Sequence, residues 1–317
     1  MRATLLARVR DLLARAGYCL SVETAMRPLA FDVVARRDGQ LLIVKVLTNV
    51  DGLSEPVAQE LRLVARFLEA VPLVVGERSS SRPLEPGAVY ARYGVHILAF
   101  ETLQDYLEDG VEPLVYAAPG GFYVNLDGVR LRALREARGL SLGDLAQAAG
   151  VSRRAIGMYE EGMGAMVEVA QRLEEFLDEP LARPHNPFLP AKPEGPEQAA
   201  PQEPFPDTFE GVVLRALAEM GFRVATTQKS PFAAIGRDDE AVVLTGFADG
   251  SPEAPKRAAA TANLSEVTET YGVFFVERTT TRVAFEGTPV VSREEVVRFA
   301  DPEDLLRLLT ERKGRAR

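Results

Sequence analysis

The same succession of apolar patterns occurs twice in this chain of 317 residues, once before residue 110 and once after residue 208. Each copy begins with an amphipathic helical pattern that ends in a glycine and an aromatic residue, Gly17-Tyr18 in the first copy and Gly221-Phe222 in the second. Strand patterns that are apolar throughout follow, such as LLIVKVL and AVVLTGF, and helical patterns lie between them. Such strands are typical of a sheet that is covered on both faces. The sequence therefore predicts two similar α/β lobes.

One short segment carries the closest correspondence between the two copies. It reads GERSSSRPLEPG at 76–87 and VERTTTRVAFEG at 276–287. The residues that recur 200 positions later are Glu77, Arg78, Arg82 and Gly87, which match Glu277, Arg278, Arg282 and Gly287. Self-similarity of this kind indicates a repeated structural unit. We therefore interpret the lobes as the products of an internal duplication. Since a repeated fold often pairs with itself, we expect these loops to join the two lobes. The alternative is that their hydroxyl and guanidinium groups bind a phosphate or a carboxylate.

Proline recurs every few residues between 183 and 207, where no apolar periodicity remains. This composition favours extended polyproline geometry, so the segment is predicted to be a semi-rigid spacer. The predicted domains are an α/β lobe at 1–110, a β-hairpin with a helical module at 111–182, the spacer at 183–207 and the second lobe at 208–317. The helical module closes with the pattern VEVAQRLEEFLD, whose predicted apolar face consists of Val169, Leu173, Phe176 and Leu177.

The composition, with 46% hydrophobic and 26% charged residues, is that of a globular protein. No apolar stretch approaches the roughly 20 residues that cross a bilayer, and arginines interrupt the first helical pattern, unlike the core of a signal peptide. We therefore expect a cytoplasmic protein without membrane contact. Cys19 is the single cysteine and is joined by only His96 and His185, too few for a His/Cys zinc site. We expect no metal and no cofactor.

From Asp127 onward the chain carries the signals that begin and end three short helices. Asp127, Ser141 and Ser152 can cap the helices at their first turns. Gly139 and Gly150 can end the first and second helices in the left-handed conformation. A tight turn at Gly150 lets two helices cross steeply, so that the third can present its first residues to a major groove. The pattern predicts a helix-turn-helix.

Residues 131–162 resemble the helix-turn-helix of the XRE family, the lambda and 434 repressor type. The residues in register are Leu145-Ala146, Gly150-Val151-Ser152, Ile156 and Tyr159-Glu160-Glu161-Gly162. The resemblance implies an all-α, lambda-repressor-like domain that binds double-stranded DNA, usually as a homodimer on paired half-sites. It assigns DNA contacts to Ser152, Arg153, Arg154, Gly157 and Met158. The alternative is a module that binds a protein, such as a component of the transcription machinery, in place of DNA.

The net charge of −9 limits how such a module can bind DNA, because affinity for DNA comes chiefly from lysines and arginines that displace counterions from phosphates. The acidic remainder of the chain would repel a duplex. We therefore expect binding through a few arginines, weak per subunit.

The whole chain resembles a group of archaeal HTH-type transcriptional regulators, most strongly from residue 1 to about 185. The segments that carry this resemblance are Leu29–Ala35, Leu114–Gly121, Arg138–Gly143 and Glu161–Leu181. It implies a sequence-specific DNA-binding transcriptional regulator whose lobes mediate dimerisation or partner binding.

A second function class is suggested by the first lobe. A helix, the strand pattern Phe31–Ala35, a turn and the strand pattern Leu42–Lys45 resemble the core of restriction-endonuclease-like and Holliday-resolvase-like folds. The resemblance implies a Mg²⁺ site made of Asp32 and an acid-X-Lys triplet that ends at Lys45. The predicted fold class is thus α/β, with two restriction-endonuclease-like lobes flanking the helix-turn-helix domain.

The triplet is incomplete, because Ile43 stands at its acidic position and supplies no oxygen ligand. Glu55 or Glu60 on the following helix could replace that carboxylate. In the second lobe, Ala233 and Thr245 stand in the places of Asp32 and Lys45. We therefore expect no enzyme activity and interpret Asp32 and Lys45 as a structural ion pair at a sheet edge. The alternative is a metal-dependent or degenerate nuclease, or a junction-binding protein, that uses Asp32, Lys45 and Glu60.

Overall fold

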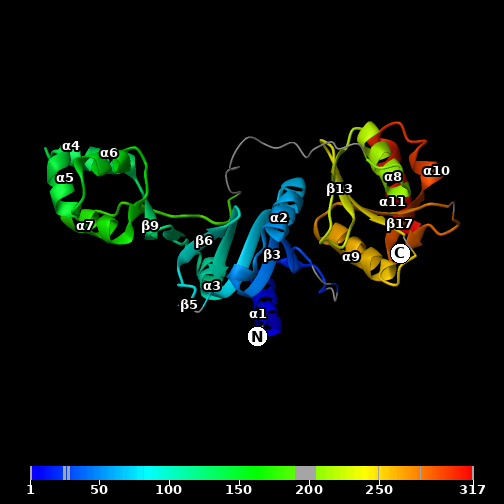
Figure 1. Ribbon diagram of the computed structural model, residues 1–317, viewed down its shortest axis with the longest axis horizontal. Helices are drawn as coiled ribbons and strands as arrows, with labels where there is room; N and C mark the ends of the chain where they lie inside the picture. Colours follow the sequence, from blue (N-terminus) through cyan, green and yellow to red (C-terminus); the bar gives the residue numbers. More distant parts are fainter. Residues whose placement is uncertain are drawn as a thin grey trace. The chain divides into compact units, whose positions relative to one another are not determined.

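A computed structural model describes residues 2–23, 26, 29–80, 82–189, 205–248, 250–278 and 280–315 (Figure 1). The chain divides into two compact units. One comprises Leu47–Gly52 and Leu73–Ala191 with Met1, and the other comprises Arg2–Val46, Leu53–Pro72 and Lys192–Arg317. Most of the predicted spacer, residues 190–204, lies outside the described residues. The predicted domain boundaries stay predictions.

The first lobe is a mixed sheet with helices, as its strand patterns predict. Its helices are α1 (Arg2–Arg15), α2 (Glu55–Leu68) and α3 (Phe100–Asp109), with a 3-10 turn at Val50–Gly52. Its strands are β1 (Cys19–Leu20), β2 (Val33–Arg37), β3 (Gln40–Asn49), β4 (Val71–Ser79), β5 (Arg82–Pro83), β6 (Ala88–Arg92) and β7 (Val95–Ala99). The strand order is β1-β2-β3-β4-β7-β6, and β5 pairs with β4. Strands β3 and β4 each begin in one compact unit and end in the other.

The second lobe repeats this arrangement. Its elements are α8 (Phe209–Glu219), β12 (Arg223–Thr226), β13 (Ala234–Arg237), β14 (Val242–Phe247), α9 (Ala254–Val267), β15 (Tyr271–Val276), β16 (Ala284–Phe285), β17 (Thr288–Ser292), α10 (Arg293–Val296) and α11 (Pro302–Arg315). The strand order, β12-β13-β14-β15-β17-β16, is that of the first lobe element by element. In the sheet order of both lobes, each of the first three strands is antiparallel to its neighbour among them. The fourth and fifth strands are parallel to each other, and the last strand is antiparallel to the fifth.

Turns of the same geometry stand at equivalent positions in the two lobes. Gly17 and Gly221, with φ of 84° and 108°, follow the first helix of each lobe. Glu69 and Glu269, with φ of 52° and 55°, end α2 and α9. These shared features support the internal duplication, which stays a prediction.

The loop correspondence at Gly87 and Gly287 is wrong. Gly287 belongs to the two-residue turn between β16 and β17, where Phe285 pairs with Thr288. The turn at this place in the first lobe joins β6 and β7 through Tyr93-Gly94, so Gly94 is the equivalent residue. Both turns have positive φ at both residues, which suits the twist of a tight hairpin. The connection that precedes them is longer in the first lobe, which shifts the numbering.

The alignment of Lys45 with Thr245 is also wrong, by one residue. The amide of Asp32 donates to the carbonyl of Val44, and the amide of Ala233 donates to that of Thr245. The place of Lys45 is therefore taken by Gly246. A Cβ at Gly246 would lie 2.1 Å from Cε2 of Phe274, so the ring of Phe274 fills the space beside the strand.

The helical module contains α4 (Gly128–Ala137), α5 (Leu142–Ala149), α6 (Arg153–Glu160) and α7 (Val167–Leu177), with strands β8 (Val115–Ala118), β9 (Gly121–Leu126), β10 (Ala165–Met166) and β11 (Ala182–Arg183). Strand β8 pairs with β6 and β9, so the predicted hairpin continues the sheet of the first lobe into the module. The module has its own core, which includes Leu131, Leu145, Ile156, Leu173 and Leu177.

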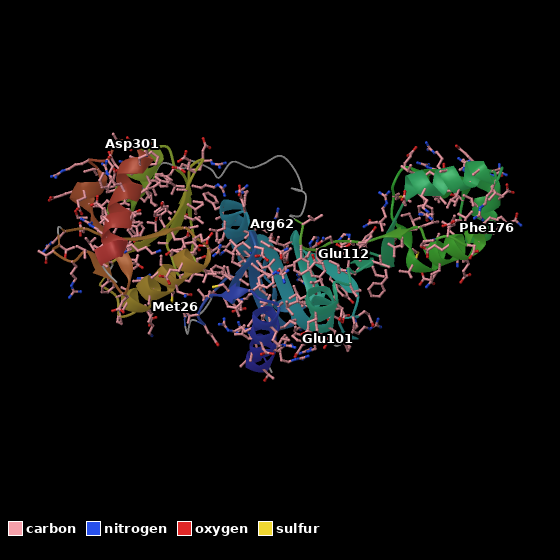
Figure 2. The ribbon with its side chains drawn as sticks, turned by 180° about the vertical axis from the view of Figure 1, so that it is seen from behind. Met26, Arg62, Glu101, Glu112, Phe176 and Asp301 are labelled. Carbon is pink, nitrogen blue, oxygen red and sulfur yellow. The ribbon has the colours of Figure 1, made fainter. Side chains whose placement is uncertain are left out.

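The apolar face of α7 differs from its prediction at one residue. Val169, Leu173 and Leu177 are buried, whereas Phe176 is 46% exposed and is labelled in Figure 2. Ala170 is buried in its place. At 100° per residue the buried face is centred between Leu173 and Leu177, and Phe176 falls just outside it.

None of the described helices is long and apolar enough to span a bilayer.

Two glycines of the module provide a matched test of its packing. A Cβ at Gly128 would lie 2.5 Å from the backbone oxygens of Tyr159 and Glu160, whereas a Cβ at Gly157 would meet nothing within 4 Å. We expect Gly128→Ala to lower the free energy of unfolding by about 1 to 3 kcal/mol through overpacking. Gly157→Ala should raise it by roughly 0.5 to 1 kcal/mol through helix propensity. Denaturant unfolding of both variants tests this, and equal effects would contradict it.

Candidate nucleic-acid interface

Local side-chain contacts fix the start of three helices of the module, α4, α5 and α6. Asp127 accepts a hydrogen bond from the amide of Arg130 at 2.9 Å, and Ser152 accepts one from the amide of Ala155 at 3.1 Å. Ser141 and Asp144 form a reciprocal capping box. Gly150 ends α5 with φ of 71°, in the left-handed region. The predicted caps and the tight turn are thereby confirmed.

The residues predicted to contact DNA gather on the exposed side of α6. Ser152, Arg153, Arg154 and Met158 are exposed, and the backbone at Gly157 is open. Ile156 and Tyr159 are buried in the core of the module. Positions four apart in a helix are neighbours, so Arg153 lies next to Gly157 and Arg154 next to Met158. The structure thus brings these five residues together on one surface, while their role in binding stays a prediction.

Arg153 also contacts the first turn of α5, a feature that sequence reasoning missed. Its guanidinium lies 3.1 Å from where a Cβ of Gly143 would stand. The pKa of Asp144 is lowered mainly by backbone and side-chain hydrogen bonds from Ser141, with a smaller effect from the charge of Arg153. A glycine at 143 therefore leaves room for Arg153 beside α5. The signal in the sequence is a glycine within a helix, which costs helix propensity unless space requires it.

A buried carboxylate fixes α6 against α4. The side chain of Glu160 is 3% exposed and accepts hydrogen bonds from Arg135 Nε at 2.6 Å and from Arg132 Nε at 3.1 Å. Burial alone would raise the pKa of Glu160, but the hydrogen bonds and charges of the two arginines lower it. An uncompensated buried charge would be costly, so the three side chains act as one unit. This network holds the two helices in one arrangement.

The segment after α7 returns to the first lobe and ties the module to it. Strand β11 pairs with β9, and beyond it the ring of Phe188 stacks on Tyr106 of α3 at 4.0 Å between centroids. His96 Nδ1 lies 3.1 Å from the carbonyl oxygen of Pro187, and His185 lies 5.6 Å from His96 between centroids. Burial, and then the charge of His96, lower the pKa of His185. Both histidines therefore serve this attachment, which the sequence did not predict.

In the nuclease-like part of the first lobe, Asp32 and Lys45 lie together as predicted. The side chain of Asp32 is fully buried, and its carboxylate accepts from Arg2 Nη2 and from the amide of Val46 at 2.8 Å. Lys45 Nζ lies 3.5 Å from Asp32 Oδ2 and donates to the carbonyl of Leu29 at 2.6 Å. Two cations and an amide therefore surround the carboxylate.

Glu60 is held elsewhere, by the second lobe. Its carboxylate accepts from the amides of Gln228 at 2.9 Å and Lys229 at 2.7 Å and from the hydroxyl of Ser230 at 2.7 Å. Ile43 is fully buried within β3. Among the described residues, no group of three or more His, Cys, Asp and Glu side chains is arranged to hold a metal ion.

The network at Glu160 gives a pH-dependent prediction. Glu160→Gln keeps the shape but removes the charge, and we expect it to destabilise α6 by on the order of 2 kcal/mol at neutral pH, because Arg135 loses its carboxylate. The folded pKa of Glu160 lies below its usual 4.5, so its contribution is complete above that value and is lost as the pH falls through the folded pKa. Hydrogen exchange of the α6 amides at several pH values measures this. A difference from the wild type that stays constant at the lowest pH would contradict it.

Comparison with known proteins agrees with this geometry. The family model described as helix-turn-helix matches residues 131–183, and that of the PD-(D/E)XK superfamily domain matches residues 2–113. The helix-turn-helix and the restriction-endonuclease-like fold of the first lobe are thereby confirmed. No solved structure matches the chain.

Relatives of nearly the same length carry the name HTH-type transcriptional regulatory protein. That of Methanocella arvoryzae is 43% identical over 317 residues, covering 98% of this chain and 97% of its own. Those of Haloquadratum walsbyi and Halobacterium salinarum are 41% and 40% identical, each over 98% of this chain, and cover 97% and 98% of their own. The chain belongs to this family of archaeal HTH-type transcriptional regulatory proteins.

Proposed function

We propose that this protein is a sequence-specific DNA-binding transcriptional regulator that places α6 in the major groove. The observation that carries the proposal is the exposed surface at the start of α6, where Arg153 and Arg154 stand over a capped and well-packed helix-turn-helix. The family match to a helix-turn-helix and the names of the relatives support it. The protein would act in the cytoplasm, where it meets DNA.

Each residue of the surface suits a distinct part of the task. Arg153 and Arg154 can take guanine O6 and N7 bidentately or grip phosphates. Met158 offers an apolar contact for a thymine methyl group. The open backbone at Gly157 allows close approach of a base edge, and Ser152 stands at a helix N-terminus, which favours a phosphate.

The charge of the chain limits the strength of this binding. With a net charge of −9, one module is expected to bind weakly, so specific sites would engage two modules on paired half-sites. A homodimer on DNA is therefore part of the proposal, and a partner from the transcription machinery is the alternative for the same surface.

Removal of both arginines tests the surface directly. Genomic fragments that bind the wild type are first selected, and an enriched palindrome among them would give the half-site spacing. Arg153→Ala with Arg154→Ala should weaken binding by at least tenfold, since each good bidentate contact contributes about 1 to 3 kcal/mol. The dependence of binding on salt should also become shallower.

A matched control removes the same charge from the second lobe. Arg298→Ala with Arg307→Ala alters two exposed arginines there and should leave binding unchanged. If the Arg153 and Arg154 variant binds the selected fragments with unchanged affinity and salt dependence, the module is a protein-binding one.

We further propose that the first lobe is not a nuclease. What supports this is the engagement of Asp32 with Arg2, Lys45 and the Val46 amide, and of Glu60 with the second lobe. The match to the PD-(D/E)XK superfamily domain keeps a metal-dependent nuclease as the second candidate.

Stability and cleavage separate these two roles of Asp32. If Asp32 is a structural acceptor, Asp32→Ala should destabilise the protein by about 3 to 5 kcal/mol, because it removes the carboxylate from Arg2 and from the largely buried Lys45. Chemical unfolding of Asp32→Ala measures this. Wild-type protein incubated with branched or single-stranded DNA and Mg²⁺ or Mn²⁺ should give no cleavage. Cleavage that is lost in the isosteric variant Asp32→Asn would establish the nuclease instead.

A further inference from the structure

The two lobes contact each other within one compact unit, and their equivalent residues can be matched through the strand registers. Cys19 pairs with Arg36 across β1 and β2, and Arg223 pairs with Arg237 across β12 and β13. Arg36 and Arg237 are therefore equivalent. The residues that end α2 and α9, Glu69 and Glu269, are equivalent because both have positive φ and the next amide of each donates five residues back.

These four residues form two reciprocal ion pairs between the lobes. Arg36 of the first lobe pairs with Glu269 of the second at 2.6 Å. Arg237 of the second lobe pairs with Glu69 of the first at 2.5 Å and also donates to the carbonyl of Phe67 at 2.7 Å. The contacting elements are exchanged in the same way, since α2 contacts β13 and α9 contacts β2.

A second set of contacts is reciprocal in kind. Glu60 of α2 accepts from the backbone just after β12, at Gln228 and Lys229. Asn263 of α9 accepts from the backbone just after β1, at the amide of Val22 at 2.7 Å. In both directions a side-chain oxygen of the helix caps the connection between the first two strands of the other lobe.

The two equivalent connections also touch each other. The amide of Ala30, between β1 and β2, donates to the carbonyl of Lys229, between β12 and β13, at 2.6 Å. A segment that contacts its own equivalent must lie near a two-fold axis. In an isologous interface, residue i of one copy contacts residue j of the other, and residue j of the first contacts residue i of the second. This kind of interface joins the two copies in a homodimer.

We propose that the two lobes form an approximate two-fold pair, in which the second lobe occupies a self-association surface of the first. The surface consists of α2, β2 and two described residues between β1 and β2, Val22 and Ala30, and its partner is the equivalent surface of the C-terminal lobe in the same chain. Arginine on one lobe meets glutamate on the other in both directions, so the surface is complementary to itself.

The contacts contribute to such an interface in different ways. Glu69 and Glu269 have side chains 74% and 65% exposed, so their ion pairs are weak and mainly set the register. Glu60 accepts from three donors, and hydrogen bonds to a carboxylate are the stronger ones. These contacts come from residues outside the Glu-Arg loops, and the role of those loops in joining the lobes stays a prediction.

The pairing of the lobes goes beyond the proposed function, because it limits how two chains can associate. If this surface is filled within each chain, two chains that meet on DNA must associate through a different surface. The DNA-reading surface of α6 takes no part in the contacts, so DNA binding and lobe pairing can fail independently.

Crosslinking of the full-length chain tests the pairing. Cys19 is the only cysteine, and Cys19→Ala supplies a cysteine-free background. Two variants are made in it, Arg36→Cys with Glu269→Cys and Glu69→Cys with Arg237→Cys, and each is treated with a short bismaleimide. We expect both to give a crosslinked species of monomer mass, in which peptides of the two lobes are joined.

The four single-cysteine variants are the control and should give no such species. Crosslinks that form only between chains would mean that the lobes pair between copies, and would overturn the proposal. So would crosslinking of one variant and not the other, since a two-fold pair requires both contacts.

Discussion

A carboxylate that is buried away from water needs cations or hydrogen-bond donors as partners. The N-terminal part of the chain is organised around one such carboxylate, that of Asp32. Its fully buried side chain gathers Arg2 from α1, Lys45 from β3 and the amide of Val46. An unmatched charge at this depth would cost several kcal/mol, so the helix and the strands are held together by its requirement for partners. The carboxylate of Asp32 is thereby engaged by groups of the protein itself.

The same rule governs the other two carboxylates that shape the molecule. Glu160 fixes α4 and α6 through Arg132 and Arg135, and Glu60 caps the backbone of the second lobe. Asp32, Glu60 and Glu160 are thus used as acceptors within the protein. The start of α6 with its arginines is exposed and takes no part in these networks, and its positive charge suits an anionic partner.

The helix-turn-helix could be predicted from the sequence because its signals act over a few residues, as between Ser141 and Asp144. Features that depend on distant segments could not. The partners of Glu60 lie 168 to 170 residues away in the sequence. No local sequence pattern predicts contacts at that separation. The equivalence at Gly94 was misplaced because the connection before its turn differs in length between the lobes. The equivalence at Gly246 was misplaced by one residue although the turns have equal length, because apolar strands tolerate a shift in alignment that only hydrogen-bond register resolves.

The proposed pairing of the lobes bears on how the protein would bind a symmetric DNA site. A homodimeric regulator supplies two modules to a two-fold site, whereas one chain with its proposed pair of lobes has one helix-turn-helix match. A palindromic operator would therefore recruit a second chain through contacts outside the paired surface of α2 and β2. Two chains of net charge −9 repel each other in solution. Each chain brings its arginines to the phosphates, so we expect the two modules to associate on DNA more readily than in its absence.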